Sequence, residues 1–180
     1  MNRLTPITSL DAIPAAYLDT PIGRLLEYHN LGRAHEPYAS AQLLIGMCMD
    51  NRIHVNIPDN FAFVIRSGGG KLRDSKFKVS YAIAVGGVRC IALIGHTDCG
   101  MVNLAARKEQ FIRGLSDGAG WERAAAEAYF NQFAPRSEIG HEVECVLSEC
   151  ARLHARYPKI LVAPFIYRVE DNRLYGITKH

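Results

Sequence analysis

Short apolar runs alternate with amphipathic stretches along most of the chain, and this alternation predicts strands connected by helices. Three mostly apolar runs, each followed by polar or glycine-rich sequence, have the form of buried strands at residues 43–48, 61–65 and 90–94. Between the second and third runs, Ser75 can cap a helix that ends at Gly86 and Gly87. The pattern therefore predicts a strand-helix-strand unit.

Three further helices are predicted to cover this sheet. Asp98 can cap a helix over about residues 99–113, and an alanine-rich helix follows at about residues 121–133. Apolar residues over 138–157 fall on one helical face, and Pro158 ends that pattern. This last segment is expected to be an amphipathic helix packed on the core.

The two ends of the chain have different patterns. Thr20 and Pro21 have the form of a helix N-cap followed by proline at the first helical position, so residues 1–40 are predicted to form an N-terminal helical arm. At the other end, apolar runs within 160–167 and 174–177 flank a polar turn, which is typical of a β-hairpin.

These elements predict one α/β domain over residues 1–180, with a central, mainly parallel sheet flanked by helices. A chain of 180 residues is long enough for one core and too short for two ordinary domains. No repeat or flexible linker divides it.

Composition and charge narrow the class of protein. Lys and Arg number 21 against 18 Asp and Glu, and no basic run interleaved with aromatic residues is present, so we expect no nucleic-acid partner. No apolar stretch approaches the ~18 residues that span a bilayer, and no signal peptide is evident, so we expect a cytoplasmic protein without a membrane partner. The five cysteines are odd in number, which favours metal ligation or buried thiols over disulfides.

Metal-ligand residues follow two of the predicted strands. Cys48 ends the first strand, and His96 and Cys99 follow the third. Zinc prefers such nitrogen and sulfur donors, and three protein ligands leave a fourth position for water. Cys99 is also expected to open a helix, whose N-terminus favours a thiolate. Each residue alone is more often a buried thiol or a structural histidine, but their joint placement favours a zinc site.

Three motifs resemble those of the β-class carbonic anhydrases, especially the small bacterial forms. They are C-x-D-x-R at 48–52, F-V-I-R at 63–66 and H-T-D-C-G-M at 96–101. The resemblance is close over residues 43–104 and weaker in the closing hairpin. It implies four parallel strands plus an antiparallel C-terminal strand, a homodimer or higher homo-oligomer, and an N-terminal arm that packs on a partner subunit.

The resemblance also implies zinc at the three predicted ligands and an Asp50–Arg52 dyad beside it. Zinc-bound hydroxide, oriented by Asp50, is then expected to attack CO₂ and give bicarbonate, while Arg52 keeps the carboxylate ionised. Asp50 has an alternative role as a fourth zinc ligand that closes the site. The simpler alternative for Asp50 and Arg52 is an ordinary ion pair in a loop.

The sequence departs from the family pattern in the predicted pocket wall. Asn51 stands where the family usually has Ser, and Ser67, Gly68 and Gly69 stand where it usually has Asn-Ala-Gly. These differences bear on turnover and substrate choice more than on metal binding. Two alternatives to CO₂ hydration therefore stay open. One is hydrolysis of carbonyl sulfide or carbon disulfide, and the other is a zinc-binding module without useful catalysis.

Other motifs are given structural interpretations. The run Gly68–Lys71 fails the spacing of phosphate-binding loops. His141 and Cys145 are four residues apart on a predicted helix, a spacing that could hold a metal. They fall among glutamates on the polar face of that helix, which indicates a solvated or subunit-facing surface instead. His54 lies just after the dyad, where a proton shuttle is possible and a plain loop histidine is more common.

Overall fold

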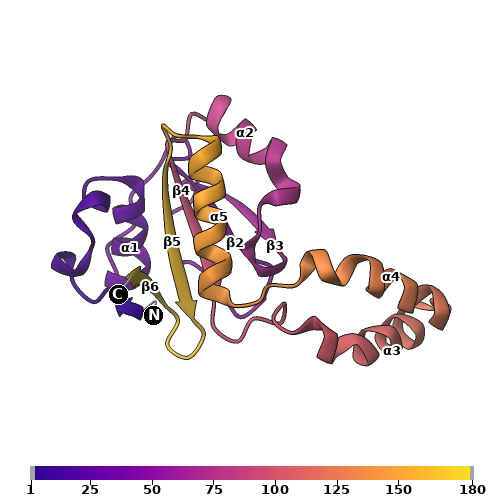
Figure 1. Cartoon of the computed structure of the whole chain (residues 1–180). Helices are drawn as coiled ribbons and strands as arrows, with labels where there is room; N and C mark the ends of the chain where they lie inside the picture. The colour runs from indigo at the N-terminus through magenta and orange to yellow at the C-terminus, as the bar shows by residue number, and fades with distance from the viewer. Residues whose placement is uncertain (1–2, 179–180) are drawn as a thin grey trace.

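The computed structural model describes residues 3–178 and has a six-stranded sheet, which lies at the centre of the molecule (Figure 1). The order across the sheet is β1-β6-β5-β4-β2-β3. The strands are β1 (Arg3–Pro6), β2 (Leu43–Cys48), β3 (Ala62–Ser67), β4 (Cys90–His96), β5 (Leu161–Arg168) and β6 (Arg173–Thr178). The middle of the sheet is parallel, since β3, β2, β4 and β5 run in one direction. Strand β6 runs antiparallel to β5, and β1 antiparallel to β6.

The predicted α/β class is therefore confirmed, together with the four parallel strands and the antiparallel C-terminal strand. Strand β1 was not predicted, because Arg3–Pro6 is short and lacks an apolar alternation. It pairs with β6 and lengthens the sheet at that edge. The two apolar runs expected near residues 160–167 form the single strand β5, which continues through Pro164.

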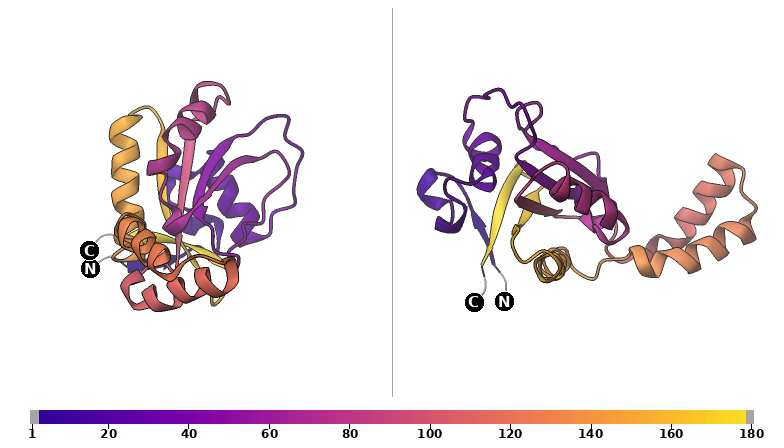
Figure 2. Two further views of the ribbon diagram at one scale, coloured as in Figure 1. Left: turned by 90° about the vertical axis from the view of Figure 1, so that its right-hand side faces the viewer. Right: turned by 90° about the horizontal axis from the view of Figure 1, so that it is seen from above.

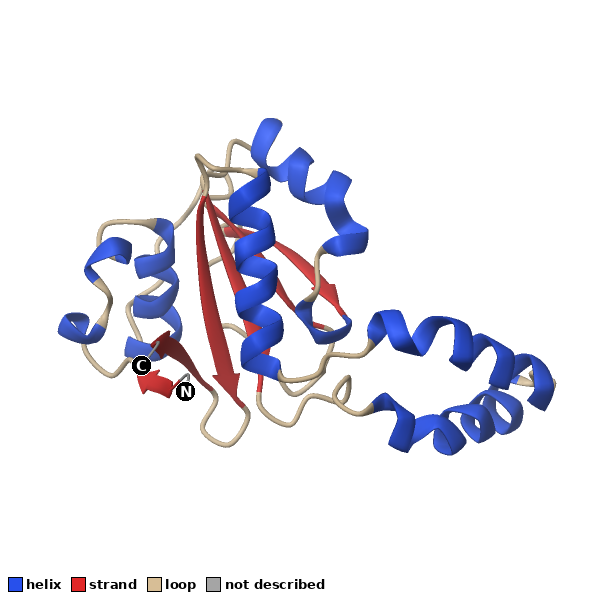
Figure 3. Ribbon diagram, viewed as in Figure 1, coloured by secondary structure: helices blue, strands red, loops and turns tan. Residues whose placement is uncertain are grey.

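Helices lie on both faces of the sheet (Figure 3). Helix α1 (Pro21–Leu31) packs on one face, whereas α2 (Lys76–Ala84) and α5 (Glu142–Arg156) cover the other. Alternate residues of β2 face the two layers: Ile45 and Met47 join the cluster with α1, and Leu44 joins the cluster with α2 and α5. This period of two is expected for a strand buried on both faces.

Helix α1 begins as predicted. The Thr20 hydroxyl accepts hydrogen bonds from the backbone N–H groups of Ile22 and Gly23, and Gly32 ends the helix in the left-handed conformation. Short helical turns precede it at Leu10–Ala12 and Ala15–Tyr17. Its apolar stripe is fully buried against its own chain. Packing of residues 1–40 on a partner subunit stays a prediction.

The helix predicted from Asp98 is wrong. Residues 99–103 are not helical and include an isolated β-bridge between Val102 and Ile139, Leu104–Arg107 make one short helical turn, and α3 begins only at Lys108 and runs to Ala119. Asp98 has a positive φ of 55°, which does not fit the extended backbone of an N-cap. Together with α4 (Arg123–Ser137), α3 forms a helical hairpin that projects from the sheet (Figure 2). Within residues 3–178, every helix is too short or too polar to cross a bilayer.

Asn30 joins α1 to the last strand. Its side chain is buried, and its amide nitrogen donates to the carbonyl oxygens of Ile7 and Leu174. Its Oδ1 accepts the backbone N–H of Leu174. The side chain thus satisfies three backbone groups that would otherwise be buried without partners.

We expect Asn30→Ala to lower the free energy of unfolding by about 3 kcal/mol, because each buried group left unpaired costs about 1–3 kcal/mol. Urea unfolding followed by circular dichroism measures this change. Asn131→Ala, on the exposed surface of α4, is the control and should leave the midpoint unchanged. A loss below about 1 kcal/mol for Asn30→Ala would contradict this account of the contact.

Candidate metal centre

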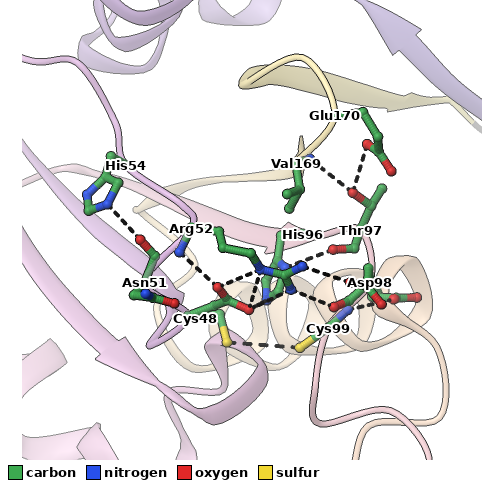
Figure 4. Close-up of polar contacts among 12 residues, drawn as sticks. Cys48, Asn51, Arg52, His54, His96, Thr97, Asp98, Cys99, Val169 and Glu170 are labelled. Carbon is green, nitrogen blue, oxygen red and sulfur yellow. Dashed lines mark hydrogen bonds and ion pairs between the residues drawn. The ribbon is translucent and has the colours of Figure 1, made fainter.

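The carboxyl ends of β2 and β4 bring Cys48, His96 and Cys99 together. The two strands are parallel neighbours, with Met47 opposite Ile94, so the chain leaves both strands at the same edge of the sheet. All three side chains are buried, and their potential ligand atoms lie within 4.8 Å of one another. The two sulfur atoms are 3.9 Å apart (Figure 4). Among residues 3–178, this is the only group of three or more Cys, His, Asp or Glu side chains close enough together to hold a metal.

The imidazole of His96 is oriented for metal binding. Its Nδ1 lies 2.9 Å from the carbonyl oxygen of Thr97, which assigns the proton to Nδ1. Its Nε2 then has a free lone pair, and this buried atom has no hydrogen-bond partner within the described chain. An unpartnered buried nitrogen beside two sulfurs fits the donor set of zinc.

The two thiols are electrostatically coupled. A hydrogen bond with Cys99 lowers the pKa of Cys48, burial opposes this effect, and nearby backbone amides lower the pKa further. The pKa of Cys99 is raised, first by its neighbour Cys48 and then by burial. The two sulfur atoms lie close enough that ionisation of one thiol opposes ionisation of the other. A divalent cation between them would displace the remaining proton, because thiolates are the metal-binding form.

Cys99 does not open a helix, so the predicted support from a helix N-terminus is wrong. Its backbone N–H instead points to Glu142 in the first turn of α5, with 3.3 Å between the nitrogen and Oε1. The loop that follows β4 and carries Cys99 is thus attached to α5, the helix that packs on β4 and β5.

Asp50 and Arg52 form the ion pair that the motif predicted. The guanidinium binds both carboxylate oxygens, with Nε 3.0 Å from Oδ1 and Nη2 2.8 Å from Oδ2. This pairing holds the pKa of Asp50 well below its usual range. Oδ2 also lies 3.8 Å from the free Nε2 of His96, so the carboxylate is a direct neighbour of the metal-ligand candidates.

Asp98 is a member of the site that sequence reasoning missed. Arg52 Nη1 is 2.7 Å from Asp98 Oδ2, and Arg52 Nη2 is 2.9 Å from the carbonyl oxygen of Asp98 (Figure 4). The position of Asp98 directly before Cys99 predicts a helix cap. Its actual partner is 46 residues away in the chain, and no local pattern shows such a contact. Arg52 therefore links the two loops that carry the metal-ligand candidates.

The predicted pocket wall lies beside these loops. Gly69 and Gly70 have φ values of 65° and 73°, and a Cβ on Gly69 would lie 2.7 Å from Ile139. Glycine is required there by both backbone conformation and close packing. The hydroxyl of Ser67 donates to the carbonyl oxygen of Lys71 within the same loop.

A cavity of about 590 Å³ separates this loop from the helical hairpin. Its wall is mainly apolar and includes Met49, Gly68, Met101, Phe111, Tyr129 and Phe133. Met49 and Gly68 border the loops of the metal centre, so the cavity adjoins it.

The remaining candidates lie outside this cluster. His54 is exposed, and its Nε2 lies 2.7 Å from the carbonyl oxygen of Asn51 (Figure 4). His141 is the N-cap of α5 and accepts the N–H of Val143 through Nδ1, while Cys145 is half-buried on the same helix.

Known proteins resemble the chain in sequence and in fold. The family described as carbonic anhydrase matches residues 43–171, which is well over half of the chain. A carbon disulfide hydrolase from Acidianus sp. (strain A1-3) is 25% identical, over 88% of this chain and 87% of that protein.

Solved structures with the same fold have lower sequence identity. A carbonic anhydrase from Glaciozyma antarctica aligns with a TM-score of 0.61 at 22% identity, covering 90% of this chain and 98% of that one. The β-carbonic anhydrase isoform I of Trichomonas vaginalis has a TM-score of 0.64 at 16% identity, covering 97% and 100%. The family match covers more than half of the chain and includes Cys48, His96 and Cys99, so this chain belongs to the β-class carbonic anhydrase family.

Proposed function

We propose that this protein is a zinc enzyme that reversibly hydrates CO₂ to bicarbonate. One observation carries the proposal: the free Nε2 of His96 and the two thiols meet beside a carboxylate that Arg52 keeps ionised. CO₂ and water give bicarbonate and one proton. Because water is a weak nucleophile until it loses that proton, the reaction needs a site that activates the water and a group that orients it.

Cys48, His96 and Cys99 would hold the zinc. When bound there, zinc supplies a Lewis acid that lowers the pKa of water at its open position. Two thiolates and a neutral imidazole cancel the charge of Zn²⁺, which makes it a weaker Lewis acid than zinc held by three histidines. The chain's own residues must therefore contribute more to the reaction.

Asp50 makes that contribution. Its Oδ2 accepts a hydrogen bond from the attacking water and directs the oxygen lone pair toward the substrate carbon. Two hydrogen bonds from Arg52 to its oxygens fix the direction of the carboxylate and keep it an acceptor. Ser67 and Gly68 line the cavity along which the uncharged substrate approaches, and Gly69 supports that wall by packing against Ile139. The apolar cavity suits such a substrate.

Carbon disulfide hydrolysis is a second candidate, favoured by the similarity to the Acidianus enzyme. The same nucleophile would attack the central carbon of CS₂, and two waters would yield CO₂ and two molecules of hydrogen sulfide. Carbonyl sulfide with one water would yield CO₂ and one hydrogen sulfide. The Met49 and Met101 side chains in the adjoining cavity are polarizable and suit sulfur-containing substrates.

The ligand assignment predicts that Cys48→Ser loses zinc. We expect about one zinc per chain in the wild type after dialysis, measured by elemental analysis, and a small fraction of that in the variant. Cys145→Ser is the matched control, because this half-buried thiol lies outside the cluster. Full zinc content in Cys48→Ser would show that the ligand set is wrong.

The dyad predicts a large effect of Asp50→Ala on turnover. Stopped-flow CO₂ hydration should slow by about 100-fold or more, since a positioned acid-base group typically contributes about 10²–10⁴-fold. Zinc content should stay at the wild-type level. Asp59→Ala removes an exposed carboxylate outside the site and should keep full activity. A fully active Asp50→Ala enzyme would refute the role of the dyad.

Substrate choice is tested by assaying CO₂, CS₂ and carbonyl sulfide on the same zinc-loaded protein, with sulfide detection for the last two. We expect CO₂ to be the substrate with the highest kcat/KM. A higher value for CS₂ would transfer the proposal to the sulfur reaction. Rates no faster than buffer with all three would leave a zinc-binding module and overturn the proposed function.

A further inference from the structure

A second arginine, Arg66, lies on β3 and contacts the loop formed by residues 48–53, which begins at the end of β2 and carries Cys48 and Asp50. Arg66 lies near the end of β3, opposite Met47 of β2. Its Nη1 donates to the carbonyl oxygens of Cys48 at 3.1 Å and Asp50 at 3.2 Å. Its Nη2 donates to the carbonyl oxygen of Ile53 at 2.8 Å. One guanidinium therefore binds three carbonyl groups of the loop formed by residues 48–53.

The backbone of this loop makes few other hydrogen bonds to the rest of the protein. The pairing of β2 with β3 ends at Cys48, and one more hydrogen bond follows, from Met49 N–H to the carbonyl oxygen of Ser67. The remaining hydrogen bonds of its backbone are local: Ile53 N–H to the Asp50 carbonyl oxygen at 3.4 Å, Arg52 N–H to Asp50 Oδ1 at 2.9 Å, and the Asn51 carbonyl oxygen with His54 Nε2 at 2.7 Å. Arg66 is therefore the main connection between the loop backbone and the sheet.

Two of the three carbonyl groups belong to residues with a role in the proposed site. Cys48 carries a sulfur of the metal cluster, and Asp50 carries the carboxylate that Arg52 binds. Fixing both carbonyl groups to one rigid, planar cation restricts the backbone from which both side chains project. Arg52 acts on the side chain of Asp50, whereas Arg66 acts on the backbone beneath it.

From this geometry we propose that Arg66 is a positioning residue for the metal centre. It holds the loop so that the Cys48 sulfur and the Asp50 carboxylate are in place before a metal or substrate binds. The inference rests on the proposed use of Cys48 as a metal ligand, but it does not depend on which substrate is converted. Loss of Arg66 should loosen the loop and weaken metal binding even in a protein that remains folded.

The chain contains a matched control. Arg89 also donates to three backbone carbonyl oxygens, those of Ile83, Gly87 and Val88. It lies just before β4, at the end of the sheet opposite the metal centre. Replacing Arg89 removes the same kind and number of contacts without touching the ligand loops.

The experiment compares Arg66→Met, Arg66→Lys and Arg89→Met in the full chain. Amide hydrogen exchange of the metal-free protein reports on residues 48–53, chelator competition gives the zinc affinity, and the visible spectrum of the cobalt(II) form reports on ligand geometry. For Arg66→Met we expect exchange in the loop to rise by about tenfold, zinc affinity to fall by about 10- to 100-fold, and the cobalt bands to shift. Arg66→Lys should lie between, because an ammonium group replaces only part of the fork.

Arg89→Met should keep the wild-type loop exchange, zinc affinity and cobalt spectrum. Wild-type zinc affinity and loop exchange in Arg66→Met would overturn the inference, and so would an equal loss of affinity in Arg89→Met. If Arg66→Met does not fold, Arg66→Lys and Arg89→Lys are compared by the same criteria. None of these readouts uses CO₂ turnover, so an inactive wild type would refute the proposed function and leave this test intact.

Discussion

The parallel pairing of β2 with β4 is the constraint on which the metal centre depends. Strands that run in the same direction end at the same edge, so Cys48 and His96 emerge side by side although 47 residues separate them in the chain. Close packing supports this pairing. A Cβ on Gly46 would lie 2.8 Å from Leu72 and Leu93, and one on Gly95 would lie 2.6 Å from Val146 of α5. A side chain at either position would therefore displace the residues packed on the strands that carry the ligand candidates.

Arginines, more than backbone ladders, organise the loops beyond these strands. Arg52 joins Asp50 to Asp98, and Arg66 joins the first loop to β3. The site gathers two thiols and two carboxylates, a set of groups that repel one another when ionised. A guanidinium can bind several oxygens at once in fixed directions, which is why it suits this position better than a lysine. A bound divalent cation would also reduce the repulsion among these negatively charged groups.

Local patterns were sufficient wherever the determining contacts are close in sequence. Thr20 caps α1 through groups two and three residues away, and apolar periodicity located β2, β4 and α5. Local patterns failed at Asp98. Its neighbours in sequence predict that it caps a helix, whereas its side chain binds Arg52. They also missed β1, because the hydrogen bonds of a short edge strand come from β6 at the far end of the chain.

The sequence by itself determined the class of fold and the residues able to bind a metal, and its resemblance to a known family implied the ion pair beside them. Hydrophobic periodicity and residue chemistry are properties that each position carries in any conformation. Tertiary structure alone decided which groups surround those residues: the free Nε2 of His96, the coupling of Cys48 to Cys99, and the contacts of Arg66. Each depends on atoms brought together from separate strands. Their distances arise only when the sheet has formed.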